Sequence, residues 1–396
     1  MSHAADTPLD RQSAAVNGDE RNSASVGPSA HGSVTARRHG KRADMLVHED
    51  EPFNAEPRPR ALAGSAITPL DAFYVRGHGP IPELDARTWR LHVGGLTERH
   101  LELSLQELRD GRFTERELVA TLQCAGNRRA ELIAVRDIPG EAPWGPGATG
   151  TATWRGVSLA GVIATAGVHP AAAHVAFVGT DRSEEATPPQ PFGASIPLAK
   201  AQAEEVLLAY EMDGQPLQPV HGAPLRVIVP GYIGARSVKW LRRIELRNEP
   251  WDGYFQDTAY RLLAPDEEPG PGVGMALGEV GLNAAILVPE DGARVPVGSI
   301  ELRGYALAGG KRRIVRVDIS RDGGTAWIQA DLLDDQGPWT WRLWRARLEL
   351  PTGHHEIVAR AWDDAAQTQP ERPETVWNPK GYANSSWARI QLHAGG

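Results

Sequence analysis

The chain contains one cysteine, Cys124, among its 396 residues. A single thiol excludes an intrachain disulfide framework, and it excludes zinc sites or metal clusters that need two thiolates. It also excludes the two-cysteine motif that attaches c-type haem. Any thiolate chemistry in this protein therefore depends on one sulfur atom.

Long apolar runs and an excess of basic residues are also missing. No run of about 18 apolar residues occurs, so we expect no membrane-spanning helix. Lys and Arg number 42 against 50 Asp and Glu, and the resulting net charge of −8 argues against a nucleic-acid-binding protein. Because 41% of the residues are hydrophobic and 23% are charged, we expect a globular protein, and the length predicts two domains.

The first 50 residues contain no Phe, Tyr or Trp. Such a segment buries too little apolar surface to offset the entropy lost on ordering, so we predict a disordered tail over residues 1–50. No apolar stretch of a secretory signal follows its basic residues. From this we expect a cytoplasmic location.

The C-terminal third has the pattern of antiparallel strands. Residues 265–280 are rich in Pro and Gly and predict a linker. Beyond them, residues 314–319 alternate between apolar and polar, a turn at 322–324 follows, and 355–362 predict a further strand. Trp339, Trp341 and Leu343 are expected on one face of another strand. This spacing predicts an immunoglobulin-like β-sandwich.

The central part mixes both kinds of element. Apolar runs predict strands over 91–93, 175–178 and 225–229, and shorter amphipathic patterns predict helices over 103–108 and 159–166. This combination indicates an α+β domain.

The segment around Cys124 contains polar and flexible residues, which is unusual for a buried core cysteine. Gly126 permits a close backbone approach, and Arg128 and Arg129 follow within five residues. If these arginines fold back toward the sulfur, their charge should lower the pKa of the thiol and favour the thiolate that soft metals and electrophiles need. The alternative is a small core residue.

Two further segments have the composition of anion-binding loops. Residues 73–82 place Arg76 and His78 in a loop rich in Gly and Pro, which suits anion recognition. In residues 221–240 a buried strand ends at Pro230, and a Gly-rich turn then presents Ser237 and Lys239, as in a phosphate-binding concavity. Taken singly, each is also compatible with an ordinary charged surface loop.

Together these segments resemble the sulfite oxidase family of molybdenum enzymes. The run from Cys124 to Arg129 is similar to the family's molybdenum-ligating motif, residues 229–240 are similar to a second signature, and residues 192–198 and 377–381 also match. The resemblance covers roughly residues 50–396. It implies an α+β molybdopterin-binding catalytic domain over 51–270, followed by an immunoglobulin-like β-sandwich dimerisation domain over 271–396.

The resemblance also implies roles for individual residues. Cys124 would ligate molybdenum beside the two dithiolene sulfurs of one pterin. The residues implied to hold the pterin and its phosphate are Tyr74, Val75, Arg76, Gly77, His78, Asp181, His221, Arg226, Ser237, Val238 and Lys239. The residues implied to form the catalytic substrate pocket are Arg76, Arg129, Trp144, Tyr260 and Lys380.

Two positions depart from the family pattern. The family usually has Asn where this chain has Gly77, which removes one polar contact near the pterin. Lys380 stands where an arginine is expected. Lysine keeps the charge but loses the planar fork that binds an oxyanion at two points, so sulfite is expected to bind more weakly, or the natural oxyanion differs.

The implied activity is the oxidation of sulfite to sulfate by oxygen-atom transfer. Three cations, Arg76, Arg129 and Lys380, are expected to neutralise the dianion within a locally positive funnel. The expected partners are sulfite or a related oxyanion, dioxygen or a separate electron carrier such as a cytochrome c, and a second copy of the chain in a homodimer. No haem, nucleic acid or membrane partner is expected.

Two alternatives are kept. One is an enzyme of the same fold that acts on another oxyanion or oxide, such as nitrate. The other is a non-catalytic binding module built on the Trp-rich sandwich.

Overall fold

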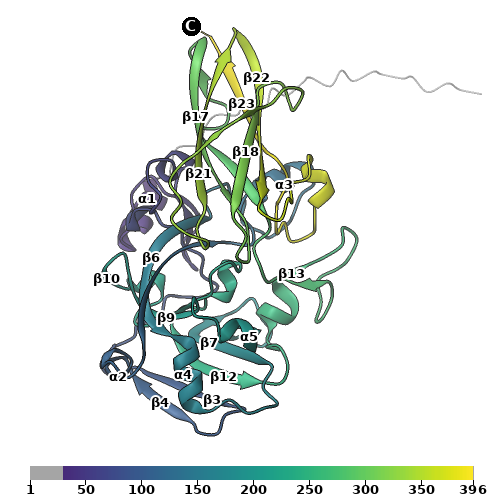
Figure 1. The fold of residues 1–396 in the computed structure, drawn as a ribbon. Helices are drawn as coiled ribbons and strands as arrows, with labels where there is room; N and C mark the ends of the chain where they lie inside the picture. The colour runs from purple at the N-terminus through teal and green to yellow at the C-terminus, as the bar shows by residue number, and fades with distance from the viewer. Residues whose placement is uncertain (1–29, 396) are drawn as a thin grey trace, which may run out of the picture.

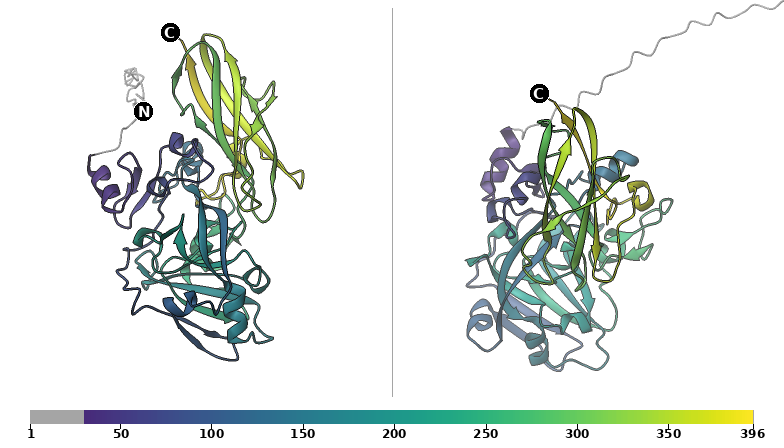
Figure 2. Two further views of the ribbon diagram at one scale, coloured as in Figure 1. Left: turned by 60° about the vertical axis from the view of Figure 1, so that its left-hand side comes forward. Right: turned by 45° about the horizontal axis from the view of Figure 1, so that its top comes forward.

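The computed structural model describes residues 30–395, and Figure 1 shows two bodies stacked along the long axis. A β-sandwich formed by residues after 280 lies at the top, and the α+β domain that precedes it lies below. Figure 2 shows the same two bodies from other sides, with the first described helix beside their junction. The expected order of an α+β domain followed by a sandwich is confirmed.

The segment before the α+β domain is ordered where it is described. It forms helix α1 (Ala30–Arg38) and a hairpin of β1 (Leu46–Glu49) with β2 (Asn54–Glu56). The prediction of disorder is therefore wrong for residues 30–50, and residues 1–29 lie outside the described part. The reason is tertiary: Ala36 and Met45 pack with Phe53, Val75 and Val220 in a small apolar cluster, which the local composition did not indicate.

The α+β domain contains two five-stranded sheets. In the first the order is β10-β9-β6-β5, with β11 also paired to β9, and its strands are β5 (Glu115–Gln123), β6 (Thr149–Ser158), β9 (Leu207–Met212), β10 (Gln215–Pro216) and β11 (Arg226–Ile228). In the second the order is β4-β3-β12-β7-β8, and its strands are β3 (Arg90–Gly95), β4 (Leu101–Ser104), β7 (His174–Ser183), β8 (Gln190–Pro197) and β12 (Leu241–Arg247). The predicted strands at 91–93, 175–178 and 225–229 fall within or overlap β3, β7 and β11.

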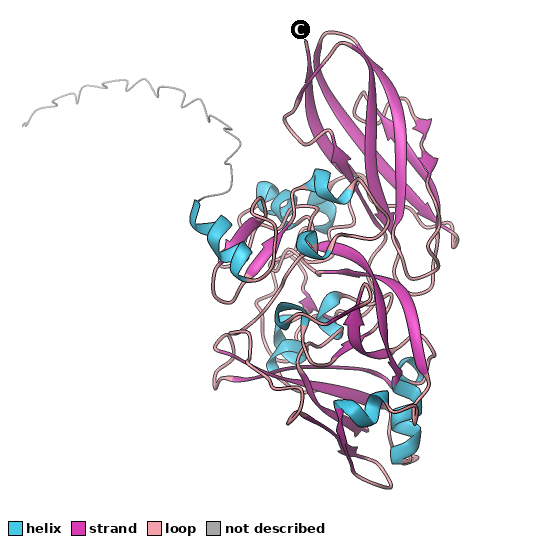
Figure 3. Ribbon diagram, turned by 90° about the vertical axis from the view of Figure 1, so that its left-hand side faces the viewer, coloured by secondary structure: helices cyan, strands magenta, loops and turns pink. Residues whose placement is uncertain are grey.

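The helices of this domain are short, as Figure 3 shows, and they are α2 (Leu105–Arg109), α3 (Arg129–Val135), α4 (Leu159–Ala166) and α5 (Leu198–Ala201). Helix α2 begins with a capping box in which Ser104 and Glu107 satisfy each other's backbone N–H groups. Helix α4 has the bounds that the sequence predicts, and α2 overlaps the prediction.

The C-terminal domain is a sandwich of two sheets. One sheet has the order β15-β17-β21-β20, with β15 (Asn283–Val288), β17 (Gly298–Leu307), β20 (Asp331–Leu332) and β21 (Arg342–Leu350). The other has the order β16-β23-β22-β18-β19, with β16 (Arg294–Val295), β18 (Ile314–Ser320), β19 (Ile328–Gln329), β22 (Gly353–Asp363) and β23 (Ala388–Ala394). Their inner faces enclose one apolar core, to which Leu302 and Ile357 contribute from opposite sheets.

The tryptophans of the sandwich differ from the sequence expectation. Trp339 and Trp341 precede β21 instead of lying on one strand with Leu343. Trp341 packs into the core of the α+β domain, and Trp339 joins the cluster around Cys124. Because Trp339, Trp341 and Trp344 are all buried, they offer no exposed aromatic face to a ligand, which argues against the binding-module alternative.

The two domains are joined by a continuous core and by hydrogen bonds. The predicted linker folds back as the hairpin β13 (Arg261–Leu262) with β14 (Met275–Ala276). Across the junction, Tyr305 accepts a hydrogen bond from Asn127 and donates one to Pro146 O. These contacts fix the sandwich beside the segment that carries Cys124. Within residues 30–395 no helix is long and apolar enough to cross a membrane.

Candidate functional site

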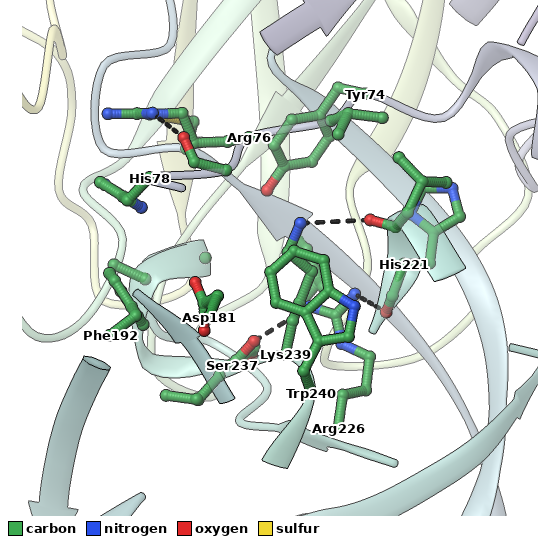
Figure 4. Close-up of a pocket in the computed structure, with 18 of the residues that line it drawn as sticks. Tyr74, Arg76, His78, Asp181, Phe192, His221, Arg226, Ser237, Lys239 and Trp240 are labelled. Atoms are coloured by element: carbon green, nitrogen blue, oxygen red, sulfur yellow. Dashed lines mark hydrogen bonds between the residues drawn. The ribbon is translucent and has the colours of Figure 1, made fainter. Parts of the chain in front are cut away.

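A pocket lies where several sequence-distant segments of the α+β domain meet. Figure 4 shows Tyr74, Arg76 and His78 along one side, with Arg226, Ser237, Lys239 and Trp240 facing them. The predicted site residues that line it are Tyr74, Val75, Arg76, Gly77, His78, Cys124, Asp181, His221, Arg226, Ser237, Val238, Lys239 and Tyr260. Every residue predicted to hold the pterin or the metal thus reaches one cavity, whereas Arg129, Trp144 and Lys380 do not line it.

Cys124 reaches the pocket because β5 ends one residue before it. Its N–H donates to Ala148 O, and its own carbonyl accepts from the N–H of Asn127, which closes a tight turn. Gly126 lies in this turn, and a Cβ there would come within 2.6 Å of the Arg129 guanidinium. The glycine therefore lets Arg129 fold back beside the cysteine.

The pKa of the Cys124 thiol differs from the sequence expectation. Burial raises this pKa, while the charges of Arg129 and Arg76 oppose the rise. Arg128 was also expected to lower the pKa of the thiol, but its side chain points away from Cys124. Its guanidinium pairs with Glu131 and donates to Ser386 O. The two adjacent arginines thus have separate tasks, since Arg129 lies near the thiol and Arg128 ties α3 to the sandwich.

Three cations meet at the turn η3 (Pro219–His221), and we call them the η3 cations: Lys41 and Arg226, which are buried, and Lys239, which is half-buried. Lys41 Nζ lies 2.6 Å from His221 Nε2, Arg226 donates to His221 O, and Lys239 donates to Val220 O. Within residues 30–395 none of the three has a carboxylate within 4 Å, although all are buried or line the pocket.

Burial changes the protonation of these groups. It lowers the pKa of Lys239 to about 7, with Arg226 adding repulsion, and it lowers the pKa of Arg226 to about 10. Burial likewise raises the pKa of Asp181 to about 6, and one oxygen of that carboxyl has no hydrogen-bond partner among the described residues. Several like charges in a dry pocket are costly unless an anion joins them.

The pocket therefore fits an anionic group combined with a soft metal. A cysteine sulfur is the ligand that a soft metal prefers, and it lies in the same cavity as the cations. Arg226 Nε is buried without a partner in the described chain, so the cluster keeps a donor for a phosphate. These features match the donor set that a molybdenum–pterin cofactor needs.

Tyr260 and His78 form a polar pair in the same pocket. The Tyr260 hydroxyl and His78 Nε2 are 2.8 Å apart, and the His78 ring stacks on Phe192 at 4.7 Å. Burial, followed by the charge of Arg76, holds the pKa of His78 well below its usual value. A neutral His78 accepts from or donates to Tyr260, which keeps the phenol in place.

Arg129 lies beside the pocket, held between two glycines. Its Nε donates to Lys380 O at 3.0 Å, and a Cβ at Gly381 would lie 2.5 Å from its side chain. The guanidinium covers the ring of Tyr382 at 5.1 Å, and that ring stacks on Tyr260. The loop that carries Lys380 and Tyr382 comes from the sandwich domain, so both domains build this edge of the site.

The predicted substrate cations, Arg76, Arg129 and Lys380, each have a carboxylate partner, and we call them the paired cations. Glu141 joins Arg129 at 3.1 Å and also contacts Lys380 Nζ, while Glu185 lies 3.6 Å from Arg76. The three positive charges that were expected to neutralise the oxyanion are therefore partly neutralised by Glu141 and Glu185. Three cations and two carboxylates give a local charge of about +1.

Trp144 occupies a different place from the pocket wall that was expected. It is fully buried, with its ring edge-on to His48 at 4.6 Å. Its Nε1 has no hydrogen-bond partner among the described residues, so the indole keeps a free donor. The substrate roles of Trp144, Arg129 and Lys380 stay predictions.

Three residues that sequence reasoning missed belong to the site: Lys41, Glu141 and Tyr382. Tyr382 follows the matched segment 377–381 and could have been found from that position. Glu141 lies 17 residues after Cys124, between the matched motif and Trp144, where no pattern was recognised. Lys41 gave no signal, because it stands in a segment predicted to be disordered.

Comparison with known proteins agrees with this geometry. The family model described as an oxidoreductase molybdopterin binding domain matches residues 78–255, and the Mo-co oxidoreductase dimerisation domain matches residues 275–395. The mitochondrial sulfite oxidase of Mus musculus is 40% identical over 362 residues, which cover 88% of this chain and 65% of that protein. This chain thus spans less than two thirds of the mouse protein's length.

Two other relatives match over nearly their whole length. The sulfite oxidase of Arabidopsis thaliana is 39% identical over 379 residues, covering 90% of this chain and 95% of that protein. The crystal structure of the sulfane dehydrogenase SoxCD from Paracoccus pantotrophus has the same fold, with a TM-score of 0.75, 24% identity and coverage of 95% and 93%. With its single pocket cysteine and these matches across both domains, the chain belongs to the sulfite oxidase family of molybdopterin-binding oxidoreductases.

Proposed function

We propose that this chain oxidises sulfite to sulfate by oxygen-atom transfer. The observation that carries the proposal is one cavity lined by Cys124, Arg76, Arg226 and Lys239, with Arg129 and Lys380 paired to Glu141 beside it. When bound, the molybdenum–pterin group supplies the two-electron redox chemistry that no protein side chain offers. The protein supplies the thiolate, the charges and the orientation.

Each group has a distinct task in this proposal. Cys124 Sγ holds the metal, and Arg226, Ser237 and Lys239 bind the phosphate of the pterin. Tyr260, aligned by His78, directs its hydroxyl toward the substrate oxygen. Arg76, whose side chain is 23% exposed, is within reach of an anion that arrives from solvent.

The paired cations set how tightly the oxyanion binds. An incoming anion competes with Glu141 for Arg129 and Lys380, and with Glu185 for Arg76. The substrate anion thus displaces a carboxylate from each cation instead of binding to an unpaired cation. This competition favours fast release of the sulfate product and moderate affinity.

Steady-state turnover of the molybdenum-loaded protein with sulfite tests the proposal. We expect sulfite-dependent activity that nitrate or an organic oxide does not replace. Nitrate turnover without sulfite turnover would assign the chain to the alternative substrate class.

We further propose that the chain works as a homodimer, without haem of its own, in the cytoplasm. The match to the dimerisation domain supports the dimer. The only cysteine lies in the cofactor pocket, which leaves no thiol for covalent haem. Electrons would then pass to dioxygen or to a separate carrier. Sulfite-dependent oxygen uptake, compared with reduction of a cytochrome c, distinguishes these acceptors.

A further inference from the structure

The segment before the catalytic domain directs Lys41 into the protein interior. Helix α1 ends at Arg38, and Gly40 adopts a positive φ of 70° that turns the chain back. The N–H of Lys41 then donates to Ala36 O at 2.9 Å, and the N–H of Arg42 donates to Asp71 O at 3.1 Å. The lysine is therefore held by backbone bonds on both sides before its side chain makes any contact.

The Lys41 side chain is 3% exposed and makes two close contacts. Its Nζ donates to Leu70 O at 2.5 Å and lies 2.6 Å from His221 Nε2. Burial lowers the pKa of Lys41 to about 7, and the charge of Asp71 opposes the change. Packing alone does not explain why a lysine is buried at this position, because an apolar side chain would pack there without the cost of desolvating a charge.

His221 connects Lys41 to the cofactor pocket. When Lys41 is charged it has only donors, so Nε2 of His221 then accepts and the ring proton resides on Nδ1. The ring also packs edge-on against Phe73 at 5.5 Å, which limits its rotation. Because His221 lines the pocket and Nε2 is engaged by Lys41, the protonated Nδ1 is the nitrogen left for the cofactor.

We propose that Lys41 is a cofactor-positioning residue, which holds the His221 imidazole in one tautomer and adds a third cation to the turn that receives the pterin phosphate. This assignment depends on the pocket being the molybdenum–pterin site, and it does not depend on sulfite being the substrate. It makes the segment over residues 30–50 a working part of the cofactor site. Partners of this kind beyond the direct ligands typically change affinity by 10- to 100-fold.

The test compares Lys41→Met with Lys41→Arg, using Arg37→Met as the matched control, because Arg37 is an exposed cation at the end of the same helix. We expect the Lys41→Met protein to lose molybdenum and pterin about tenfold faster on dialysis, measured by metal analysis and pterin fluorescence. Lys41→Arg should restore much of the retention, since it keeps the charge. Arg37→Met should match the unaltered protein.

A second measurement separates a positioning role from a structural one. In the cofactor-free protein the desolvation of Lys41 and its repulsion of Lys239 offset its contacts with Leu70 O and His221, so Lys41→Met should change the melting temperature little. Inorganic phosphate should raise the melting temperature of the cofactor-free unaltered protein, and raise it less in Lys41→Met. Unchanged cofactor retention in Lys41→Met, or a melting temperature that falls as much without the cofactor as with it, would overturn the proposal. A sulfite assay without turnover leaves these readouts intact, so failure of the proposed substrate is distinguished from failure of this inference.

Discussion

Lys41, Arg226 and Lys239 have no carboxylate within 4 Å among residues 30–395, whereas Arg76, Arg129 and Lys380 each have one. The two groups lie at neighbouring parts of one site. They differ in whether a carboxylate contacts each cation. The η3 cations have no carboxylate in contact, although the charges of Asp181 and Asp71 act on Lys239 and Lys41, and this arrangement suits a resident anion that stays bound. The paired cations are already neutralised in part, which suits an anion that exchanges in every turnover.

Among the variants that test this comparison, we expect the largest loss of activity from substitution of Cys124. Cys124→Ser should reduce sulfite turnover by about a thousandfold or more, since a direct metal ligand matters more than its outer partners. Circular dichroism and size-exclusion chromatography should show the fold and the dimer intact. Substantial remaining activity would remove Cys124 from the metal.

The pH dependence of stability follows from the η3 cations. Burial lowers the pKa of both Lys41 and Lys239 to about 7, against 10.5 in the unfolded chain. Between these values the unfolded chain binds more protons, so stability of the cofactor-free protein should rise with pH from about 7 to about 10.5. Urea denaturation at pH 7 and pH 9.5 measures this rise.

The loaded protein provides the contrast to that experiment. The pterin phosphate should keep both lysines charged, so the dependence on pH should be weaker after loading. An equal slope with and without the cofactor would contradict the idea that the η3 cations face an anion.

Removing the carboxylate from the paired cations should have a moderate effect. Glu141→Gln frees Arg129 and Lys380 for the oxyanion, and we expect the KM for sulfite to fall about three- to tenfold with little change in kcat. The dependence of KM on salt should become steeper. Glu117→Gln, which removes a carboxylate from an exposed pair with Arg155, is the control and should change neither value.

The smallest effect is expected for Lys380→Arg. The planar guanidinium should bind an oxyanion better, but Glu141 competes for it, so the KM for sulfite should fall only about twofold. In the Glu141→Gln background the same change should lower KM further, because the competitor is gone. Equal effects in both backgrounds would show that Glu141 does not control Lys380.

Much of the cofactor pocket follows from local sequence. The single cysteine near Gly126, the Gly-rich turn before Ser237 and the loop around Arg76 each have a composition that suits a binding segment. Strand alternation likewise located β18 and β22, since a side-chain period of two is a local property. The meeting of these segments in one cavity was implied by the family resemblance and not by any one segment.

What the sequence could not predict depends on partners far along the chain. Arg128 and Arg129 are neighbours of the same type, yet one faces Ser386 and the other faces Tyr382. The charge of Lys380 was evident from the sequence, but its pairing with Glu141 arises only because a loop of the sandwich reaches the loop that follows α3. Residues 30–50 lack the composition of a folded segment and become ordered because Ala36 and Met45 find apolar partners in the α+β domain.

The sequence by itself therefore determined the kind of chemistry: one thiolate, a phosphate-binding turn and cations for an oxyanion. The tertiary structure alone decided which charges stay without a counter-ion and which are neutralised. The physical reason is that residue type sets the charge a side chain carries, whereas the free energy of that charge depends on burial and on neighbours within a few ångströms. Those neighbours come from both domains and from a segment that the sequence alone did not assign to the fold.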